Sequence, residues 1–151
     1  MTPAFLWPLP SEFSKVSSPF GTRIHPVTHK EQKHSGIDVP CPQGTELHAP
    51  CDGTIRSVWM DEGFGGGLSV TIEADGTPIR IGFAHLSAAN AKVKKGQTIR
   101  RGEVIGLSGG KPGTYGAGRS TGPHLHITVR DIASGKLMDP DKLAWEGRGA
   151  E

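Results

Sequence analysis

Short runs in which apolar and polar side chains alternate are the feature that most limits how this chain can fold. The clearest run extends from His124 to Arg130, where Leu125, Ile127 and Val129 alternate with polar residues. A period of two is that of a β-strand, because successive side chains point to opposite faces of a sheet. One face of this run is therefore predicted to lie in the core, and the other carries His124 and His126.

Two more alternating runs predict a β-hairpin. They extend from Leu68 to Glu73 and from Ile79 to Phe83, and Asp75-Gly76 supplies a turn signal between them. Residues 54–59 and 103–107 are further strand candidates. Ser87 to Val93 is predicted to form at most one short helical turn.

Frequent turn residues limit the length of the elements. The 151 residues include 22 glycines and 12 prolines, which favours short elements joined by tight turns. We expect an all-β fold and a single domain over residues 1–151, with one core. Residues 1–17 are predicted to be irregular, as is most of the chain up to Val39, and Gly106 to Gly122 is predicted to be a long loop.

Charge and hydropathy exclude some classes of function. The net charge is only +2 and the basic residues are scattered, so we expect no nucleic-acid partner. No apolar run approaches the roughly 20 residues of a membrane helix. Met1 to Pro10 has no basic segment and is interrupted by prolines, so it is not predicted to be a signal peptide. A substrate outside the cytoplasm would then require another route of release, or a leader absent from this chain.

The two cysteines, Cys41 and Cys51, are too few for a cysteine-type zinc site. We interpret them as two small buried side chains rather than a disulfide, because nothing in the chain indicates an oxidising compartment.

Three groups of residues can carry chemistry. His34 and Asp38 share a face of an extended chain, and imidazole with carboxylate suits zinc; the alternative is a surface histidine and a turn aspartate. His124 and His126 start roughly 6.5–7 Å apart on one strand face, although a polar strand face can carry two histidines by chance. Strict alternation places His85 toward the core, so either the strand ends before it or it lies in a buried site; the alternative is a core histidine without a catalytic role.

Together these segments resemble the lysostaphin-type or LytM-like zinc peptidases, family M23. The matching stretches run in the family's order over roughly residues 18 to 130. They are Ser18-Pro19-Phe20-Gly21-Thr22-Arg23, His34-Ser35-Gly36-Ile37-Asp38, Asp52-Gly53-Thr54-Ile55, Phe83-Ala84-His85-Leu86 and Ser120-Thr121-Gly122-Pro123-His124-Leu125-His126.

The resemblance implies a role for each residue of the site. His34, Asp38 and His126 correspond to the zinc ligands, and three protein ligands leave a fourth position for water. His124 and His85 correspond to the catalytic histidines. Zinc lowers the pKa of its water, and an imidazole can transfer the proton or hydrogen-bond the oxyanion.

The family also implies a largely antiparallel sheet, with the metal in a groove walled by loops. The implied activity is hydrolysis of peptide cross-links in bacterial peptidoglycan, at the D-Ala to meso-diaminopimelate bond or, alternatively, at a Gly-Gly bridge. We expect a monomer that acts on the cell wall, periplasmic or extracellular. Without a signal peptide or wall-binding repeat, the chain fits an antibacterial phage endolysin or a domain excised from a longer exported protein.

The chain departs from the family pattern in two places. Some members carry a tyrosine ahead of the first ligand, where this chain has only His25 and His29 as substitutes. The Gly-rich loop is longer than in the shorter members, and we expect it to form a wall of the groove with Tyr115 and Arg119 as contacts.

Two rival functions come from other classes. Residues 49–55 and 93–105 resemble the half-motifs of biotinyl and lipoyl carriers, but the interval between them lacks the Met-Lys-Met of a carrier turn and the histidines stay unexplained. The second rival is an inactive LytM-like domain that binds cell wall or activates another hydrolase. Such domains usually lack a metal ligand, whereas this chain matches at all five site positions.

Overall fold

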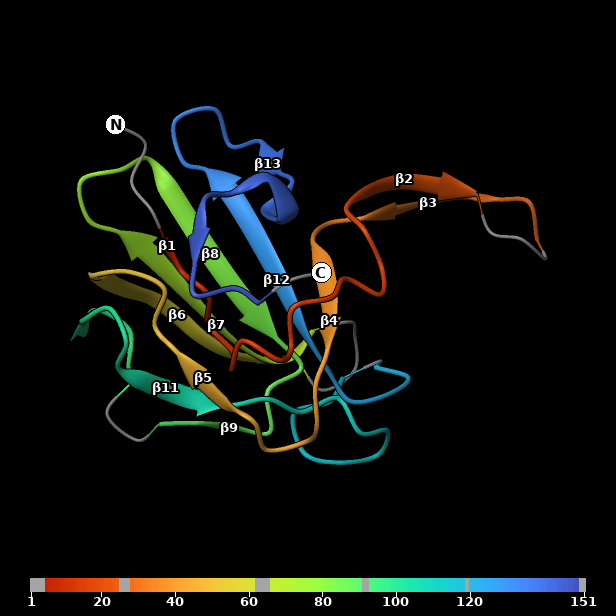
Figure 1. The fold of residues 1–151 in the computed structure, drawn as a ribbon, viewed down its shortest axis with the longest axis horizontal. Coiled ribbons are helices and arrows are strands. Elements are labelled where there is room, and N and C mark those ends of the chain that lie inside the picture. The colour runs from red at the N-terminus through yellow and green to blue at the C-terminus, as the bar shows by residue number, and fades with distance from the viewer. Residues whose placement is uncertain (1–4, 25–27, 62–65, 91–92, 119, 150–151) are drawn as a thin grey trace.

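The computed structural model describes residues 5–24, 28–61, 66–90, 93–118 and 120–149. A twisted seven-stranded sheet dominates it, with the strand order β10-β6-β7-β8-β12-β13 and with β4 also paired to β12 (Figure 1). The strands of this main sheet are β4 (Ile37–Pro40), β6 (Gly53–Asp61), β7 (Gly67–Ala74), β8 (Ile79–Ala84), β10 (Thr98–Ile99), β12 (His124–Asp131) and β13 (Leu137–Met138).

Smaller elements surround the main sheet. A three-stranded sheet contains β5 (Glu46–His48), β11 (Val104–Leu107) and β9 (Ala88–Ala89). The hairpin of β2 (Gly21–Ile24) and β3 (Glu31–His34) projects away from the main body (Figure 1). β1 (Phe5–Leu6) runs parallel to β14 (Trp145–Glu146), and η1 (Pro140–Lys142) is a single 3-10 turn.

The predicted all-β class and the largely antiparallel sheet are confirmed. Among the residues that the structure describes, every strand pair except β1 with β14 is antiparallel. The described residues form no α-helix, and within them no helix has the length and apolar character of a membrane span.

The alternation in β12 places its apolar side chains in the core. Leu125, Ile127 and Val129 are each 0% exposed, whereas the polar residues between them are partly accessible. They pack in one cluster with the inward side chains of β7 and β8 and with Leu47 and Ile105 of the smaller sheet. The main sheet is therefore buried on one face and polar on the other, as the period of two predicts.

The predicted hairpin is also confirmed. β7 and β8 pair in register, with Val70 opposite Phe83 and Glu73 opposite Arg80. Gly76, in the connecting turn, has a φ of 71°, a left-handed conformation that glycine adopts without a steric penalty. The strands predicted over residues 54–59 and 103–107 correspond to β6 and β11.

The prediction that most of the chain up to Val39 is irregular missed four strands. This part contributes β1, β2, β3 and β4, and Phe5, Trp7 and Leu9 belong to the core. Two of these strands were missed because their sequences, Gly-Thr-Arg-Ile and Glu-Gln-Lys-His, show no apolar alternation. They pair with each other, so backbone hydrogen bonds rather than a buried face define them.

The helical turn predicted over Ser87 to Val93 was also wrong for the described residues. Ala88 and Ala89 form β9, which pairs with Leu107 and Gly106 of β11. The backbone N–H of Ser87 donates to Leu107 and that of Asn90 to Ile105, so this segment bonds to a distant strand instead of to itself. Residues 91 and 92 lie outside the described part of the chain.

Candidate metal centre

Strand β12 brings the predicted site residues together. Its N-terminal half lies between β4 and β8, and the register places His126 opposite Asp38 on one side and Ala84 on the other. His85 follows Ala84 directly, and His124 lies two residues before His126. The pairing of β4, β12 and β8 thus brings together four of the five predicted site residues, which are Asp38, His85, His124 and His126.

The fifth residue, His34, ends β3 and reaches Asp38 through a tight turn. Its Nε2 atom lies 3.4 Å from Oδ2 of Asp38. Gly36, in this turn, lies so close to β12 that a Cβ atom would be 1.9 Å from the carbonyl oxygen of Ile127. Only glycine lets the turn pack there, which explains why this spacing brings imidazole and carboxylate together.

His34, Asp38 and His126 can hold a metal ion. One potential ligand atom from each lies within 4.8 Å of the others, and Nδ1 of His126 is 2.7 Å from Oδ1 of Asp38. Two imidazole nitrogens and a carboxylate oxygen are ligands that zinc accepts, and bonds of about 2.0–2.2 Å place tetrahedral ligands roughly 3.3–3.6 Å apart. The three residues fit a zinc ion after small adjustments of their side chains.

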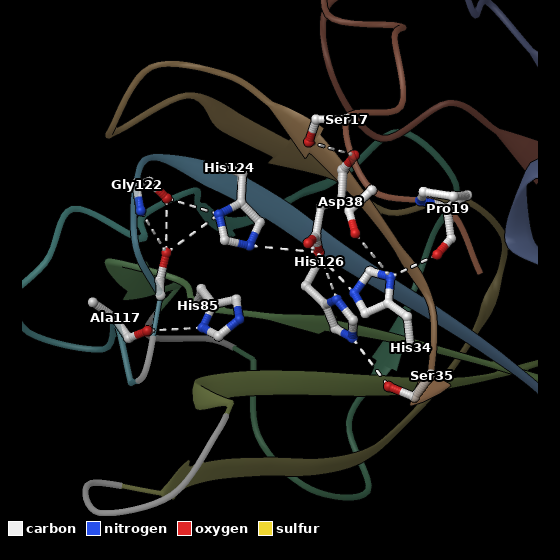
Figure 2. A network of polar contacts seen from close by, with 12 residues as sticks. Ser17, Pro19, His34, Ser35, Asp38, His85, Ala117, Gly122, His124 and His126 are labelled. Atoms are coloured by element: carbon white, nitrogen blue, oxygen red, sulfur yellow. Dashed lines mark hydrogen bonds and ion pairs between the residues drawn. The ribbon is translucent and has the colours of Figure 1, made fainter. Parts of the chain in front are cut away.

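Neighbouring groups orient the two imidazoles of this group. Nδ1 of His34 donates to the carbonyl oxygen of Pro19 at 2.9 Å, which leaves Nε2 directed at Asp38. His126 has the opposite arrangement, since its Nε2 lies 3.3 Å from the hydroxyl of Ser35 and its Nδ1 faces Asp38 (Figure 2). Hydrogen bonds of this kind select the ring nitrogen that is available to a metal.

The other two histidines lie beside this group with their rings held in the same way. Nδ1 of His85 donates to the carbonyl oxygen of Ala117 at 2.7 Å, and Nδ1 of His124 donates to that of Gly122 at 2.7 Å (Figure 2). A nitrogen that donates to a carbonyl carries the proton, so each neutral ring keeps a lone pair on Nε2. Nε2 of His124 lies 3.5 Å from Oδ1 of Asp38, and the rings of His85 and His124 are 4.9 Å apart.

His85 leaves the sheet instead of facing the core. Its φ is 61°, a left-handed conformation that is uncommon for a residue with a Cβ atom. Two hydrogen bonds hold it there, from its N–H to the carbonyl of Gly66 at 2.8 Å and from its ring to Ala117. The strand therefore ends before His85, which is one of the two alternatives left by the alternation.

Burial and charge affect the ionisation of the site. Burial lowers the pKa of His85 and outweighs the opposing hydrogen bond to Ala117, which favours the neutral imidazole. Burial raises the pKa of Asp38. The hydrogen bond from His126 and the nearby histidines together lower it by more than burial raises it, so the net shift of the pKa is downward. A carboxylate that stays ionised is the form that binds a metal.

Sequence reasoning assigned no role to the groups that orient the imidazoles. Three of them are backbone carbonyls, which no residue type reveals. The other two are the hydroxyls of Ser35 and Ser120. Ser120 is 8% exposed, and its Oγ donates to Gly122 at 2.7 Å and lies 3.2 Å from Nδ1 of His124. The sequence signal for both serines is their place in the matching stretches that also contain the site histidines.

A hollow of about 340 Å³ adjoins Asp38 and His124, and Ser17, Ser18 and residues 121–123 also line it. The end of the Gly-rich loop therefore walls this hollow. Tyr115 instead lines a separate hollow with Met60 and Asp61 and is 67% exposed. Arg119, the other expected contact, lies outside the described residues.

The remaining candidates do not join the site. His29 is exposed with a φ of 58°, and His25 lies outside the described residues. Cys41 is buried, Cys51 is half-buried, and both are free thiols. Within the described ranges, the group of side chains able to hold a metal includes neither thiol.

Comparison with known proteins shows which family shares this arrangement. The sequence model of "Peptidase family M23" matches residues 32–140. The DD-carboxypeptidase/endopeptidase Mpg of Neisseria meningitidis is 38% identical over 135 residues, 89% of this chain and 28% of Mpg. The peptidoglycan DD-endopeptidase ShyA of Vibrio cholerae is 36% identical over 124 residues, 82% of this chain and 26% of ShyA.

A solved structure agrees with the sequence relatives. A zinc-containing peptidase from Vibrio cholerae superposes with a TM-score of 0.77 at 31% identity, over 96% of this chain and 41% of the other. The chain thus spans less than a third of the two curated relatives and less than half of this structure.

Proposed function

The chain belongs to peptidase family M23, and from this membership and the geometry of the site we propose that it is a zinc-dependent endopeptidase of bacterial peptidoglycan. The observation that carries the proposal is the convergence of two kinds of groups. His34, Asp38 and His126 offer ligand atoms within 4.8 Å of one another, and two more imidazoles adjoin them with their Nε2 atoms left available.

We assign the metal to His34, Asp38 and His126. When bound, zinc polarises a carbonyl oxygen and lowers the pKa of a coordinated water. The chain's own contribution is to keep Asp38 ionised and to hold each imidazole by its second nitrogen, through Pro19 for His34 and Ser35 for His126. Ligands fixed in this way need little reorganisation when substrate binds.

We assign proton transfer and oxyanion stabilisation to His124 and His85. Each ring donates Nδ1–H to a backbone carbonyl, so Nε2 is the atom that takes up a proton. Once protonated, the same Nε2 donates a hydrogen bond to a developing oxyanion or gives its proton to the leaving amine. The short ring-to-ring separation of 4.9 Å lets both imidazoles act on one peptide group.

The substrate assignment follows the relatives. ShyA is named a peptidoglycan DD-endopeptidase and Mpg a DD-carboxypeptidase/endopeptidase. We propose that this chain likewise cuts the peptide cross-link, at the bond between D-Ala and meso-diaminopimelate, and that it acts on the cell wall outside the cytoplasm. A Gly-Gly bridge is the alternative substrate.

The test combines metal analysis with digestion of two peptidoglycan types, one with diaminopimelate cross-links and one with glycine bridges. We expect about one zinc per chain, loss of activity with a chelator, recovery with zinc, and fragments of the diaminopimelate type by mass spectrometry. Full activity in metal-free protein would refute the assignment. Stoichiometric zinc without hydrolysis of either material would indicate the inactive wall-binding or activating domain instead.

A further inference from the structure

A basic hollow lies on the polar face of the main sheet, and none of the residues that line it is assigned as a metal ligand or a catalytic group. We propose that this hollow is a subsite for a free carboxylate of the peptide substrate, within about two to three residues of the bond that is cut. The inference rests on the proposed peptidase function and deepens it, because it names the charge that the substrate must carry.

The strand register places this hollow beside the metal centre. His126 lies opposite Ala84, two residues further Thr128 lies opposite Gly82, and two residues further again Arg130 lies opposite Arg80. Side chains two apart on a strand share a face, so the metal ligand, a hydroxyl and an arginine follow one another along β12. The rows of His126 and Arg130 are four residues apart, roughly 13 Å along the strand.

The hollow occupies about 290 Å³ of this face. Its lining includes Arg56, Arg80 and Arg130 together with the hydroxyls of Ser35, Thr71 and Thr128. Ser35 also lies 3.3 Å from Nε2 of His126, so the hollow begins at a proposed metal ligand. None of the residues that line it in the described part of the chain is acidic.

Gly82 keeps the floor of the hollow open. A Cβ atom at this position would lie 2.5 Å from Oγ1 of Thr128 and 3.6 Å from Oγ1 of Thr71. Any side chain here would therefore occupy the space between the two hydroxyls. The backbone of Gly82 is not in a left-handed conformation, so its conformation does not require glycine. Glycine is needed here because a side chain would collide with Thr128.

The arginines are only partly committed to other partners. Nη2 of Arg80 pairs with Glu73 at 3.2 Å, and its Nε is buried without a hydrogen-bond partner among the described residues, so the donors offered to the hollow are mainly those of Arg56 and Arg130. Nη1 of Arg130 donates to the carbonyl of Gly135, and Arg56 is exposed. A guanidinium has five N–H donors in a planar fork that matches a carboxylate, so these side chains retain donors for an anion.

The chemistry of the hollow distinguishes the two candidate substrates. Diaminopimelate carries a carboxylate in addition to the groups in the peptide chain, whereas a glycine bridge carries no charge. An extended peptide covers about 3.3–3.6 Å per residue. The arginine row lies roughly 13 Å from that of His126 along the strand, and the arginine side chain covers part of this distance. The subsite therefore receives a carboxylate within about two to three residues of the cut bond. The hollow thus favours the diaminopimelate type.

The experiment uses two synthetic cross-linked peptides, identical except that one has a free carboxylate within about two to three residues of the scissile bond and the other has a primary amide at the same position. Wild type is compared with R56Q/R130Q, with the charge-retaining R130K, and with R100Q, which removes an exposed arginine outside the hollow. Zinc content and thermal unfolding confirm that each variant is folded and loaded. The zinc-free proteins are titrated with both peptides by NMR as a measure of binding independent of catalysis.

We expect wild type to show a KM about 10–100-fold higher for the amide than for the carboxylate peptide, the range expected for hydrogen bonds to a charged group. R56Q/R130Q should raise KM for the carboxylate peptide by a similar factor, with kcat and the amide peptide little changed. For the carboxylate peptide, the KM of R130K should lie between those of wild type and R56Q/R130Q, and the KM of R100Q should equal that of wild type. If the double variant does not fold, R130K and the single variant R56Q carry the comparison.

Two results would refute the proposed subsite and leave the peptidase function standing. One is an equal KM of wild type for both peptides, and the other is an equal rise in KM for both peptides in the double variant. Hydrolysis of neither peptide by zinc-loaded wild type would instead refute the peptidase function. In that case the NMR titrations test the proposed subsite. Binding of the carboxylate peptide alone would support it, and equal binding of both peptides or binding of neither would refute it.

Discussion

At the scale of single residues, backbone carbonyls determine how the site imidazoles can act. His34, His85 and His124 each donate Nδ1–H to a carbonyl oxygen, at 2.9, 2.7 and 2.7 Å. His126 instead directs Nδ1 at Asp38. The hydrogen bond made by one ring nitrogen thus selects the nitrogen that faces the site, Nε2 in His34, His85 and His124 and Nδ1 in His126.

His124 and His126 should have separable roles although only one residue lies between them. We expect His126→Ala to lose both zinc and activity, because it removes a proposed ligand. His124→Ala should keep zinc and lose about 10²–10⁴-fold in turnover, the usual contribution of a general acid or base. The measurement is zinc stoichiometry after dialysis alongside hydrolysis of peptidoglycan.

The opposite pattern of zinc loss would exchange the two roles. Equal loss of zinc in both variants would mean that His124 is also a ligand, leaving His85 as the catalytic histidine.

The two thiols should be unreactive in the folded protein and dispensable for catalysis. Burial, together with Asp52 and Asp75, raises the pKa of Cys51 to about 12, and burial raises the pKa of Cys41. The thiolate is the reactive form, and a pKa of 12 leaves about one Cys51 in 10⁴ ionised at pH 8. We expect slow alkylation by iodoacetamide at pH 8, measured by mass spectrometry, and fast alkylation of both thiols in urea.

The double variant C41S/C51S tests the second part of this prediction. It should retain zinc and turnover if it folds. A folded variant that has lost zinc would show that a thiolate is a ligand.

At the scale of elements, the Gly-rich loop holds His85 through a close backbone contact. The backbone N–H of Leu68 donates to the carbonyl of Gly116 at 2.9 Å, and the next carbonyl, that of Ala117, accepts from the ring of His85. A Cβ atom at Gly116 would be 1.9 Å from the carbonyl oxygen of Leu86. The loop can therefore reach His85 only with glycine at this position.

Gly116 and Gly113 make a matched pair, since both have a φ of 80° but a Cβ atom at Gly113 meets nothing within 4 Å. Gly113→Ala should cost about 1–2 kcal/mol of stability through the left-handed conformation alone and leave kcat unchanged. Gly116→Ala should cost more and lower kcat about 10-fold or more, with zinc retained, because the Ala117 carbonyl is displaced. The readouts are urea unfolding, kcat and zinc content, and equal effects of the two variants would contradict the proposed support of His85.

At the scale of the whole molecule, the first and last strands of the described chain, β1 and β14, and the residues beside them close one side of the core. Trp7 is 2% exposed, lies edge-on to Trp145 at 5.2 Å, and is covered by the guanidinium of Arg148 at 4.5 Å from its ring. Arg148 also pairs with Asp141 at 2.7 Å. Segments more than a hundred residues apart therefore stabilise the same part of the core.

Trp7→Ala should lower the free energy of unfolding by about 3–5 kcal/mol, the usual cost of removing a buried tryptophan. Trp59, 65% exposed on the main sheet, provides the control, and Trp59→Ala should change stability by about 0.5 kcal/mol or less. Urea unfolding of both variants at one fixed zinc concentration makes the comparison, since ligand binding shifts apparent stability. A similar effect of the two substitutions would mean that the terminal segment does not stabilise the core.

The amino-acid sequence by itself determined the features that depend on local periodicity and turn chemistry. The alternation in β12 predicted the buried Leu125 and the shared face of His124 and His126, and Asp75-Gly76 predicted the hairpin of β7 and β8. These features follow from which side chains must leave water and from which residues a tight turn accepts. They need no knowledge of what lies beside each strand.

Only the tertiary structure decided which strands are neighbours and what each imidazole bonds to. Asp38 and His126 are 88 positions apart and meet because β4 pairs with β12, while β2 and β3 have no apolar pattern that would reveal them. The carbonyls of Pro19, Ala117 and Gly122 belong to backbone groups that every residue has, so no residue type marks them. Pairing partners and backbone acceptors are set by how distant segments pack, and that is why the sequence named the candidate histidines but not the contacts that orient them.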